Sequence, residues 1–265
     1  MFEITGKIAL VTGGVSGIGL AISQELLRNG LKAIVLVDVN EVLGQKVLGE
    51  MKEEFGSDKV LFLKADVREK ESLEEAFNFA VQSFQHLDIV INAAGILTER
   101  KIENTIATNL NGTIYGTLLA FEGYLPKYKK GTEGVILNIA STTGLEPFDC
   151  APIYSCTKWG VVGFTRCLGT ERQYKRNNIK VLALCPGFTN TPSLPVVKDK
   201  DDFINFNYQT FFESTTKSVI LQPASHVAKA AMWAISQGES GSMWVVTDNE
   251  PVYEAKFEDR KLFPV

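Results

Sequence analysis

The sequence predicts one α/β domain, in which a parallel sheet is covered by helices on both faces. Three observations predict it: seven short β-branched apolar runs, longer amphipathic stretches between most of them, and no repeat or linker in 265 residues. Several short runs are apolar at successive positions, which is typical of strands buried on both faces of a parallel sheet. Regular alternation of strand and helix favours a doubly wound sheet with right-handed crossovers.

The elements follow one another in a regular order along the chain. The predicted strands are 7–12, 33–38, 59–65, 87–93, 134–141, 179–185 and 242–247. The predicted helices are 17–30, 41–55, 69–85, 103–129, 152–176 and 225–237. We therefore expect residues 1–265 to form a single domain.

Residues 188–222 break this alternation. The segment is long, mixed in charge and aromatic, and it directly follows the end of a strand. A long insertion in a compact domain is often a binding lid, and we expect this one to cover the substrate. A surface excursion with one or two packed helices is the alternative.

Composition argues against two classes of partner. A net charge of −4 and a pI near 5.4 do not indicate the excess of positive charge that is typical of nucleic-acid-binding proteins. No apolar run approaches the ~18 residues that span a bilayer. The N-terminus, MFEITGK, does not resemble a signal peptide, so a cytoplasmic protein is expected.

The cysteines and histidines predict neither disulfides nor a metal site. None of the four cysteines forms a CxxC pair, and together with only two histidines they make a poor set of metal ligands. We expect reduced thiols, although Cys156, two residues after Tyr154, could also form a substrate-side wall.

The turn after the first strand predicts a phosphate-binding loop. Gly13, Gly17 and Gly19 fit T-G-x-x-x-G-x-G between a strand and a helix. Glycine permits the turn and the close approach of backbone to a pyrophosphate, which the helix N-terminus would face. Ser16 and Ile18 belong to the same predicted contact, and a glycine turn without a ligand is the alternative.

Asp38, at the end of the second strand, predicts the choice of cofactor. It lies about 20 residues past the glycine loop, where a carboxylate can accept both hydroxyls of an adenosine ribose. The chain continues D-V-N-E, with no arginine or lysine for a 2′-phosphate, so Asp38 and Val39 favour NAD over NADP. Asp38 could instead cap the next helix, a role that Asn40 could also take.

Two further stretches follow strands at the same edge of the sheet. Asp66 and Val67 follow the third strand, where a carboxylate can meet the adenine amino group. At the end of the fourth strand, small residues leave room for a cofactor. This stretch is Asn92, Ala93, Ala94 and Gly95.

A tyrosine and a lysine, Tyr154 and Lys158, predict a proton-transfer pair. They are four apart on a helix that begins at Pro152, and so share one face. A phenol with a pKa near 10 is a poor base at neutral pH, but a nearby ammonium lowers that pKa. On an arbitrary helix the same pair is more often an ordinary part of the exposed surface.

Other polar residues complete this predicted site. The Ser141 hydroxyl can bond the substrate oxygen, and the Asn109 carboxamide could hold a water near Lys158, with Asn111 as an alternative. Residues after the sixth strand could meet the nicotinamide and the phosphates. They are Pro186, Gly187, Phe188, Thr189, Asn190 and Thr191.

In combination these motifs resemble the short-chain dehydrogenases/reductases over nearly the whole chain. The resemblance rests on the glycine loop, N-A-A-G, a serine thirteen residues before Tyr-x-x-x-Lys, and P-G-x-x-x-T. It implies a Rossmann fold with a seven-stranded sheet in the order 3-2-1-4-5-6-7 and a tetrad of Asn109, Ser141, Tyr154 and Lys158. It also implies homodimers, or tetramers, built through helices 103–129 and 152–176.

Within that family the chain is similar to insect-type alcohol dehydrogenases and to NAD-dependent hydroxyprostaglandin dehydrogenases, both of which oxidise secondary alcohols. The second group has a substrate-contacting glutamine three residues before the tyrosine, where this chain has Ala151. The comparison favours NAD-dependent oxidation of a secondary, or also primary, alcohol of the insect type, with an aromatic segment able to line a larger pocket. A hydroxyprostaglandin, retinol or steroid dehydrogenase, an NADPH-dependent carbonyl reductase and an NAD-binding protein without turnover are the alternatives.

Overall fold

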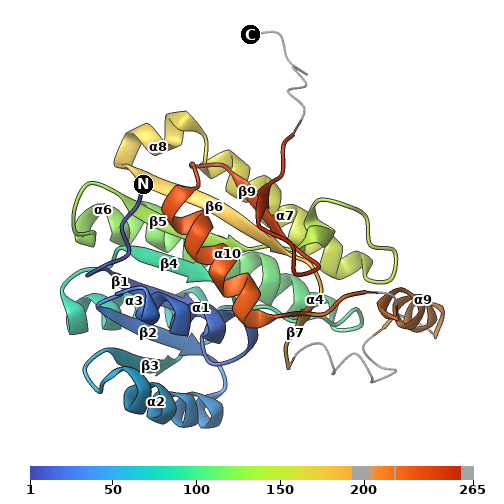
Figure 1. Ribbon diagram of the computed structural model, residues 1–265, viewed down its shortest axis with the longest axis horizontal. Helices are drawn as coiled ribbons and strands as arrows, with labels where there is room; N and C mark the ends of the chain where they lie inside the picture. Colours follow the sequence, from blue (N-terminus) through green and yellow to red (C-terminus); the bar gives the residue numbers. More distant parts are fainter. Residues whose placement is uncertain (193–202, 205, 218, 258–265) are drawn as a thin grey trace.

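The computed structural model describes residues 1–192, 203–204, 206–217 and 219–257, and its centre is one twisted sheet (Figure 1). The strand order is β10-β9-β6-β5-β4-β1-β2-β3. The parallel strands are β1 (Ile8–Thr12), β2 (Ala33–Asp38), β3 (Val60–Lys64), β4 (Ile89–Asn92), β5 (Gly134–Ile139), β6 (Ile179–Pro186) and β9 (Met243–Val246). The doubly wound parallel fold is confirmed.

The strand count differs from the prediction. An eighth strand, β10 (Tyr253–Glu254), pairs antiparallel with β9, and a separate pair joins β7 (Thr189–Asn190) to β8 (Gln222–Pro223). Each of these strands is two residues long. Such strands are too short to show alternation, so periodicity does not reveal them.

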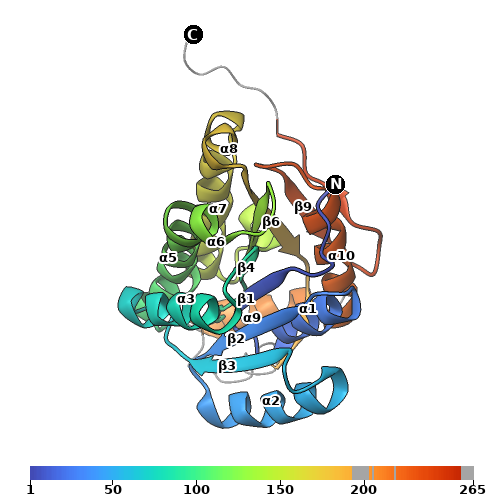
Figure 2. The same ribbon diagram turned by 90° about the vertical axis from the view of Figure 1, so that its left-hand side faces the viewer.

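Helices cover both faces of the sheet (Figure 2). One layer contains α1 (Gly17–Arg28), α2 (Glu41–Phe55) and α10 (Ala224–Gln237). The other contains α3 (Lys70–Phe84), the helical run from 102 to 128, and α7 (Pro152–Leu168). Successive strand residues face opposite layers, since Val11 belongs to the core cluster that contains Ile22 of α1, while Leu10 belongs to the one that contains Phe77 of α3.

Two predicted helices are interrupted. The first is α4 (Ile102–Ile106), α5 (Gly112–Leu118) and α6 (Leu125–Tyr128), separated by π-helical turns η1 (Ala107–Asn111) and η2 (Leu119–Tyr124). The second divides between α7 and α8 (Glu171–Asn177) at Gly169, where a Cβ would lie 2.3 Å from the Gly241 Cα atom. The backbones of Gly169 and Gly241 thus pack too closely for a side chain at the end of α7.

The segment predicted to cover the substrate lies partly outside the described residues. Its described part includes α9 (Phe206–Thr216), and Phe212 of this helix packs with Phe203 and Cys150. A short 3-10 turn, η3 (Thr142–Gly144), follows β5. None of the helices within the described ranges is long and apolar enough to cross a membrane.

Candidate active site

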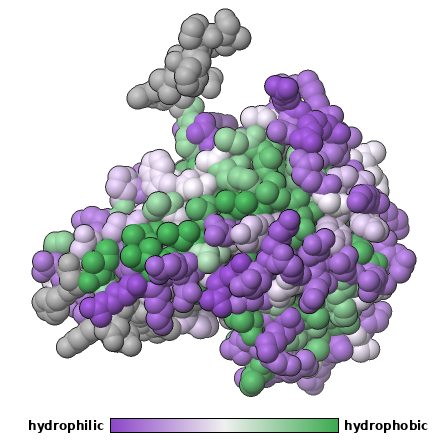
Figure 3. All heavy atoms as spheres, turned by 180° about the vertical axis from the view of Figure 1, so that it is seen from behind, coloured by the Kyte–Doolittle hydropathy of each residue, from purple (hydrophilic) through white to green (hydrophobic). Residues whose placement is uncertain are grey.

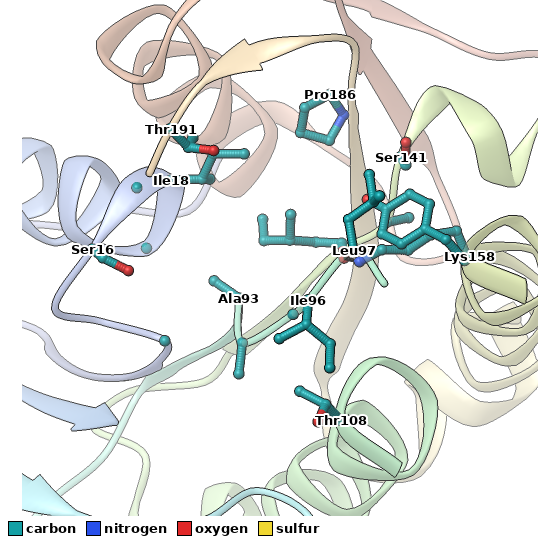
Figure 4. Close-up of a pocket in the computed structure, with 18 of the residues that line it drawn as sticks. Ser16, Ile18, Ala93, Ile96, Leu97, Thr108, Ser141, Lys158, Pro186 and Thr191 are labelled. Atoms are coloured by element: carbon teal, nitrogen blue, oxygen red, sulfur yellow. Dashed lines mark hydrogen bonds between the residues drawn. The ribbon is translucent and has the colours of Figure 1, made fainter. Parts of the chain in front are cut away.

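One cavity of about 490 Å³ lies along the carboxyl ends of the parallel strands. It includes the point between β1 and β4 where the strand order reverses, which is where such sheets bind ligands. Figure 4 shows Ser16 and Ile18 on one side of it and Ser141 and Lys158 on the other. The predicted residues that line it are Gly13, Ser16, Gly17, Ile18, Gly19, Asp38, Val39, Asp66, Val67, Ala93, Ala94, Gly95, Ser141, Tyr154, Lys158, Pro186, Gly187, Phe188, Thr189 and Thr191.

The glycine loop forms a cradle that larger residues would fill. Gly13 and Gly17 have φ values of 63° and 50°, which favour glycine. A Cβ on Gly19 would lie 2.2 Å from the Gly13 carbonyl oxygen. Ser16 precedes α1, makes no capping hydrogen bond with its side chain, and lines the cavity. The loop and the free first turn of α1 thus suit a phosphate group.

Asp38 lies on the cavity wall at the end of β2. Its carboxylate accepts hydrogen bonds from the N–H groups of Val15, Val39 and Asn40, with a distance of 3.0 Å to the Asn40 nitrogen. Burial raises the pKa of this carboxyl, and the three N–H groups act in the opposite direction. Asn40, whose side chain accepts from the Leu43 N–H, caps α2. Asp38 is therefore not the helix cap.

Asp66 also lines the cavity, but its carboxylate is held by a residue that the sequence reasoning missed. The Arg68 guanidinium donates to both Asp66 oxygens and, through Nη1, to the Asn104 side chain at 3.1 Å. These bonds hold the pKa of the Asp66 carboxyl below its usual range. Arg68 and Asn104 line the cavity too, so any ligand here meets an ion pair rather than a lone carboxylate.

Asn92 does not line the cavity. Its buried carboxamide donates hydrogen bonds to the Asn138 side chain at 2.8 Å and to the Thr117 hydroxyl at 3.1 Å. It therefore links β4 to β5 and α5. Of the predicted stretch from 92 to 95, only the last three residues reach the cavity.

Asn109 does not line the cavity either. It lies fully buried in η1, where its Oδ1 accepts from the Ile96 N–H at 2.8 Å. Its Nδ2 donates to the Ile96 carbonyl oxygen at 2.8 Å and to the Thr157 hydroxyl at 3.3 Å. Both ends of the carboxamide thus bond the chain itself, and they fasten the loop after β4 to α7.

Ser141, Tyr154 and Lys158 converge on the other side of the cavity. The Ser141 hydroxyl is hydrogen-bonded to the Tyr154 side chain. The Lys158 Nζ donates to the Ile139 carbonyl oxygen at 2.9 Å and lies 5.5 Å from the Tyr154 ring centroid. Lys158 is only 5% exposed, which is unusual for a lysine. A residue that is buried, charged and turned to a cavity is a candidate for chemistry.

The pKa values of this pair differ from the prediction. Burial raises the pKa of Tyr154 to about 12, and the hydrogen bond with Ser141 acts in the opposite direction. Burial lowers the pKa of Lys158 to about 8. The expected net lowering of the Tyr154 pKa is therefore not found, because desolvation by burial is the largest effect on this side chain.

One part of the cavity wall is apolar and aromatic. Phe148 and Phe188 meet edge to face with ring centroids 5.7 Å apart, and Phe212 of α9 packs behind both. Sequence patterns gave no signal for Phe148, which lies in an irregular loop. The other lining residues that were missed are Ala65, Ile96, Leu97, Thr108, Ile139, Ala140, Thr142 and Thr143.

The described residues contain no cluster of three His, Cys, Asp or Glu side chains that could hold a metal ion. All four cysteines are free, with Cys150 and Cys185 buried and Cys156 and Cys167 exposed. Cys156 is absent from the residues that line the cavity.

Comparison with known proteins identifies the family. Residues 7–202 match the model of the short chain dehydrogenases. The chain belongs to the short-chain dehydrogenase family. As a member of that family it is an oxidoreductase, and the resemblance seen in the sequence is confirmed.

This short-chain dehydrogenase is similar to proteins from both groups that the sequence resembles. It is 32% identical over 264 residues to 15-hydroxyprostaglandin dehydrogenase (NAD+) from Rattus norvegicus, covering 99% of this chain and 97% of the relative. It is 37% identical over 190 residues to alcohol dehydrogenase 1 from Ceratitis capitata, covering 72% and 73%. A short chain dehydrogenase/reductase from Burkholderia phymatum, solved in complex with NAD, shares its fold with a TM-score of 0.77 at 21% identity, covering 89% and 88%.

Proposed function

We propose that this short-chain dehydrogenase oxidises a secondary alcohol to the carbonyl compound, with NAD as the hydride acceptor. One observation carries the proposal: a single cavity joins a glycine cradle and Asp38 to Ser141, Tyr154 and Lys158. The first set suits a dinucleotide and the second suits removal of a proton from an alcohol.

The residues of the cradle fit NAD. Gly13, Gly17 and the N-terminus of α1 would hold the pyrophosphate, because a Cβ at these glycines would strain the turn or occupy its space. Asp38 would accept the ribose hydroxyls and repel the 2′-phosphate of NADP. The names of the prostaglandin dehydrogenase relatives and the bound ligand of the Burkholderia structure agree with this choice.

Side chains of this protein would bind the substrate oxygen and accept its hydroxyl proton. The Ser141 hydroxyl would bond the substrate oxygen, and Tyr154 as phenolate would accept the hydroxyl proton. Since the pKa of Lys158 is about 8, this side chain is largely an ammonium at neutral pH and favours the phenolate. NAD, when bound, supplies the hydride acceptor and a positive charge close to the phenol. Asn109 would act through its bonds to Ile96 and Thr157, which hold the catalytic wall together.

The apolar wall supports a substrate larger than propanol. Leu97, Phe148 and Phe188 line the cavity, and their rings and methyl groups would bury a bulky apolar substituent. Ala151 is fully buried and does not line the cavity, so it offers no counterpart to the glutamine of prostaglandin dehydrogenases. We therefore propose a substrate like those of the insect-type alcohol dehydrogenases. Hydroxyprostaglandins, retinol and steroid alcohols are the alternative substrate class.

The first test measures NADH formation with a panel of alcohols. The panel runs from propan-2-ol through farnesol and retinol to hydroxysteroids and prostaglandins, with NADP in parallel. A rate that is faster with NAD on one class would support the proposal. Tight NAD binding with no turnover on any member would favour a binding protein instead.

Replacing the proposed base tests the mechanism. Tyr154→Phe removes the hydroxyl that accepts the proton and should lower kcat by roughly 100-fold or more. Binding of NADH, measured by fluorescence, should remain. Normal turnover by this variant would rule out Tyr154 as the base.

We also propose that the protein is a homodimer. The face opposite α10 carries a continuous apolar band (Figure 3). On that layer, Leu118 of α5 and Trp159 of α7 are 38% and 48% exposed. Large apolar side chains grouped on one face favour contact with a second copy of the chain.

A further inference from the structure

The loop after β4 carries a carboxylate that the proposed mechanism does not use. Glu99 is fully buried, 0% exposed, although glutamate is rarely buried without a partner. Its partners are two backbone groups. Oε2 accepts from the Ile153 N–H and Oε1 from the Tyr154 N–H, each at 2.8 Å.

These two bonds complete the first turn of α7. The first N–H groups of a helix have no partner within the helix. In α7, Pro152 has no N–H, and the Ser155 N–H already bonds the Ala151 carbonyl oxygen at 2.9 Å. The residue before the helix, Ala151, has no side chain that could cap it. Glu99 therefore supplies the acceptors for both remaining donors, Ile153 and Tyr154.

We infer that Glu99 is a positioning residue, which fixes the first turn of α7 and thereby the place of the Tyr154 hydroxyl in the cavity. The inference rests on the proposed function, because only there does Tyr154 accept a proton. Glu99 is absent from the residues that line the cavity, and it acts through the backbone of Tyr154.

The same carboxylate joins two walls of the site. Ile96 and Leu97, just before Glu99, line the cavity on the loop that follows β4. Asn109 makes a second link, since it bonds Ile96 on that loop and Thr157 on α7. The Thr157 hydroxyl in turn donates to the Tyr154 carbonyl oxygen at 2.6 Å. The loop and the catalytic turn are thus fastened at two points, of which Glu99 holds the one at Tyr154.

Burial raises the pKa of the Glu99 carboxyl, while its two backbone donors act in the opposite direction. Desolvation is therefore the larger effect on this carboxyl, and it penalises the charged form. Its two hydrogen bonds fix the geometry of the first turn of α7.

The test uses Glu99→Gln, with Glu103→Gln as the matched control. The amide keeps the size of the side chain but replaces one acceptor oxygen with an NH2 group, which cannot accept. Glu103 makes the same chemical change possible on an exposed residue at the start of α4. Two quantities are measured: the kinetics of alcohol oxidation and the amide hydrogen exchange of Ile153 and Tyr154 by NMR.

We expect Glu99→Gln to lower kcat by roughly 10-fold or more, with KM for NAD changed by less than about twofold. Exchange should accelerate at residues 153 and 154 of α7 and stay unchanged in the strands of the central sheet. Glu103→Gln should behave as wild type. If Glu99→Gln does not fold, Glu99→Asp, which keeps the charge on a shorter side chain, carries the same two measurements.

Three results would overturn the inference: unchanged kcat, unchanged exchange at both amides, or equal losses in the Glu103→Gln control. A wild-type protein that oxidises no alcohol with NAD would refute the proposed function instead. The exchange data would then still decide whether Glu99 holds the turn, independently of turnover.

Discussion

At the scale of single residues, desolvation dominates the electrostatics of the site. It raises the pKa of Tyr154 and lowers that of Lys158, because burial penalises the charged form of each side chain. A lysine this deeply buried opposes folding while it remains charged. The lysine is nevertheless where the chemistry would need a cation, which is a usual conflict between stability and activity.

The cost of the buried ammonium should depend on pH. The pKa of Lys158 is about 8 in the folded protein and 10.5 ordinarily, a difference equivalent to about 3 kcal/mol. Below the folded pKa the lysine is charged in both states, so the full cost is present. The cost falls as pH rises from the folded to the unfolded value, because the folded state then holds fewer protons.

Lys158→Met should therefore gain stability relative to wild type at about pH 7, and this gain should shrink toward about pH 10. Urea unfolding at both pH values measures it. Lys127→Met, at an exposed position in α6, is the control. A difference between Lys158→Met and wild type that stays constant with pH would contradict the assignment of the low pKa to Lys158.

Asp38 should set the choice between the two cofactors. Asp38→Ala removes the carboxylate that would repel a 2′-phosphate, so the ratio of kcat/KM for NADP to that for NAD should rise by roughly 10-fold or more. Initial rates with both cofactors give the ratio, with the exposed Asp58→Ala as control. An unchanged ratio would favour the carbonyl reductase alternative.

At the scale of elements, long periodic segments were predictable, and their interruptions were not. The amphipathic pattern indicated one helix over 103–129, whereas this run contains two π-helical turns, Ala107–Asn111 and Leu119–Tyr124. A π-helical turn differs from an α-helix in its i→i+5 hydrogen bonds, which hydrophobic periodicity does not report. Likewise the Tyr-x-x-x-Lys spacing placed Tyr154 and Lys158 on one face of a helix, and the family resemblance added Ser141 to them. Neither could show that Glu99, fifty-five residues before Tyr154, reaches its backbone, since that contact depends on the path of an irregular loop.

Gly116 shows how close the packing between α5 and β4 is. A Cβ on Gly116 would lie 2.1 Å from the Asn92 Oδ1, and Asn92 is held by Thr117 and Asn138. Glycine to alanine within a helix ordinarily stabilises by about 1 kcal/mol. Gly116→Ala should instead lower the free energy of unfolding by about 1 kcal/mol or more.

Gly49 in α2 is the matched control, because nothing lies within 4 Å of its added Cβ. Gly49→Ala should stabilise by about 0.5–1 kcal/mol. Thermal unfolding of both variants shows whether each substitution raises or lowers the free energy of unfolding. Stabilisation by Gly116→Ala would show that Asn92 can move aside.

At the scale of the whole molecule, the order of the strands brings the two halves of the site together. The neighbours β1 and β4 lead into loops that contribute the cradle and the Ala93–Gly95 wall, while β5 and β6 carry Ser141 and Pro186 to the same edge. Alternating elements predicted the doubly wound class, but the strand order came from the family resemblance. Local pattern does not encode which strands become neighbours.

The proposed dimer gives a prediction at this scale. Trp159→Arg places a charge on the exposed surface of α7 and should convert the dimer to monomers, as measured by light scattering after gel filtration. Trp233→Arg, on α10 in the opposite layer and 41% exposed, should leave the dimer intact. The reverse result would place the contact on the α10 face.

The two-residue strand β10 has a consequence for solubility. It covers part of the β9 backbone, which would otherwise be a row of open hydrogen-bonding groups available to another molecule. Removing the chain from Pro251 onward should leave that row bare and promote edge-to-edge aggregation, visible as turbidity on gentle warming. By this reasoning, a strand too short to leave a pattern in the sequence helps to keep the sheet from growing beyond one molecule.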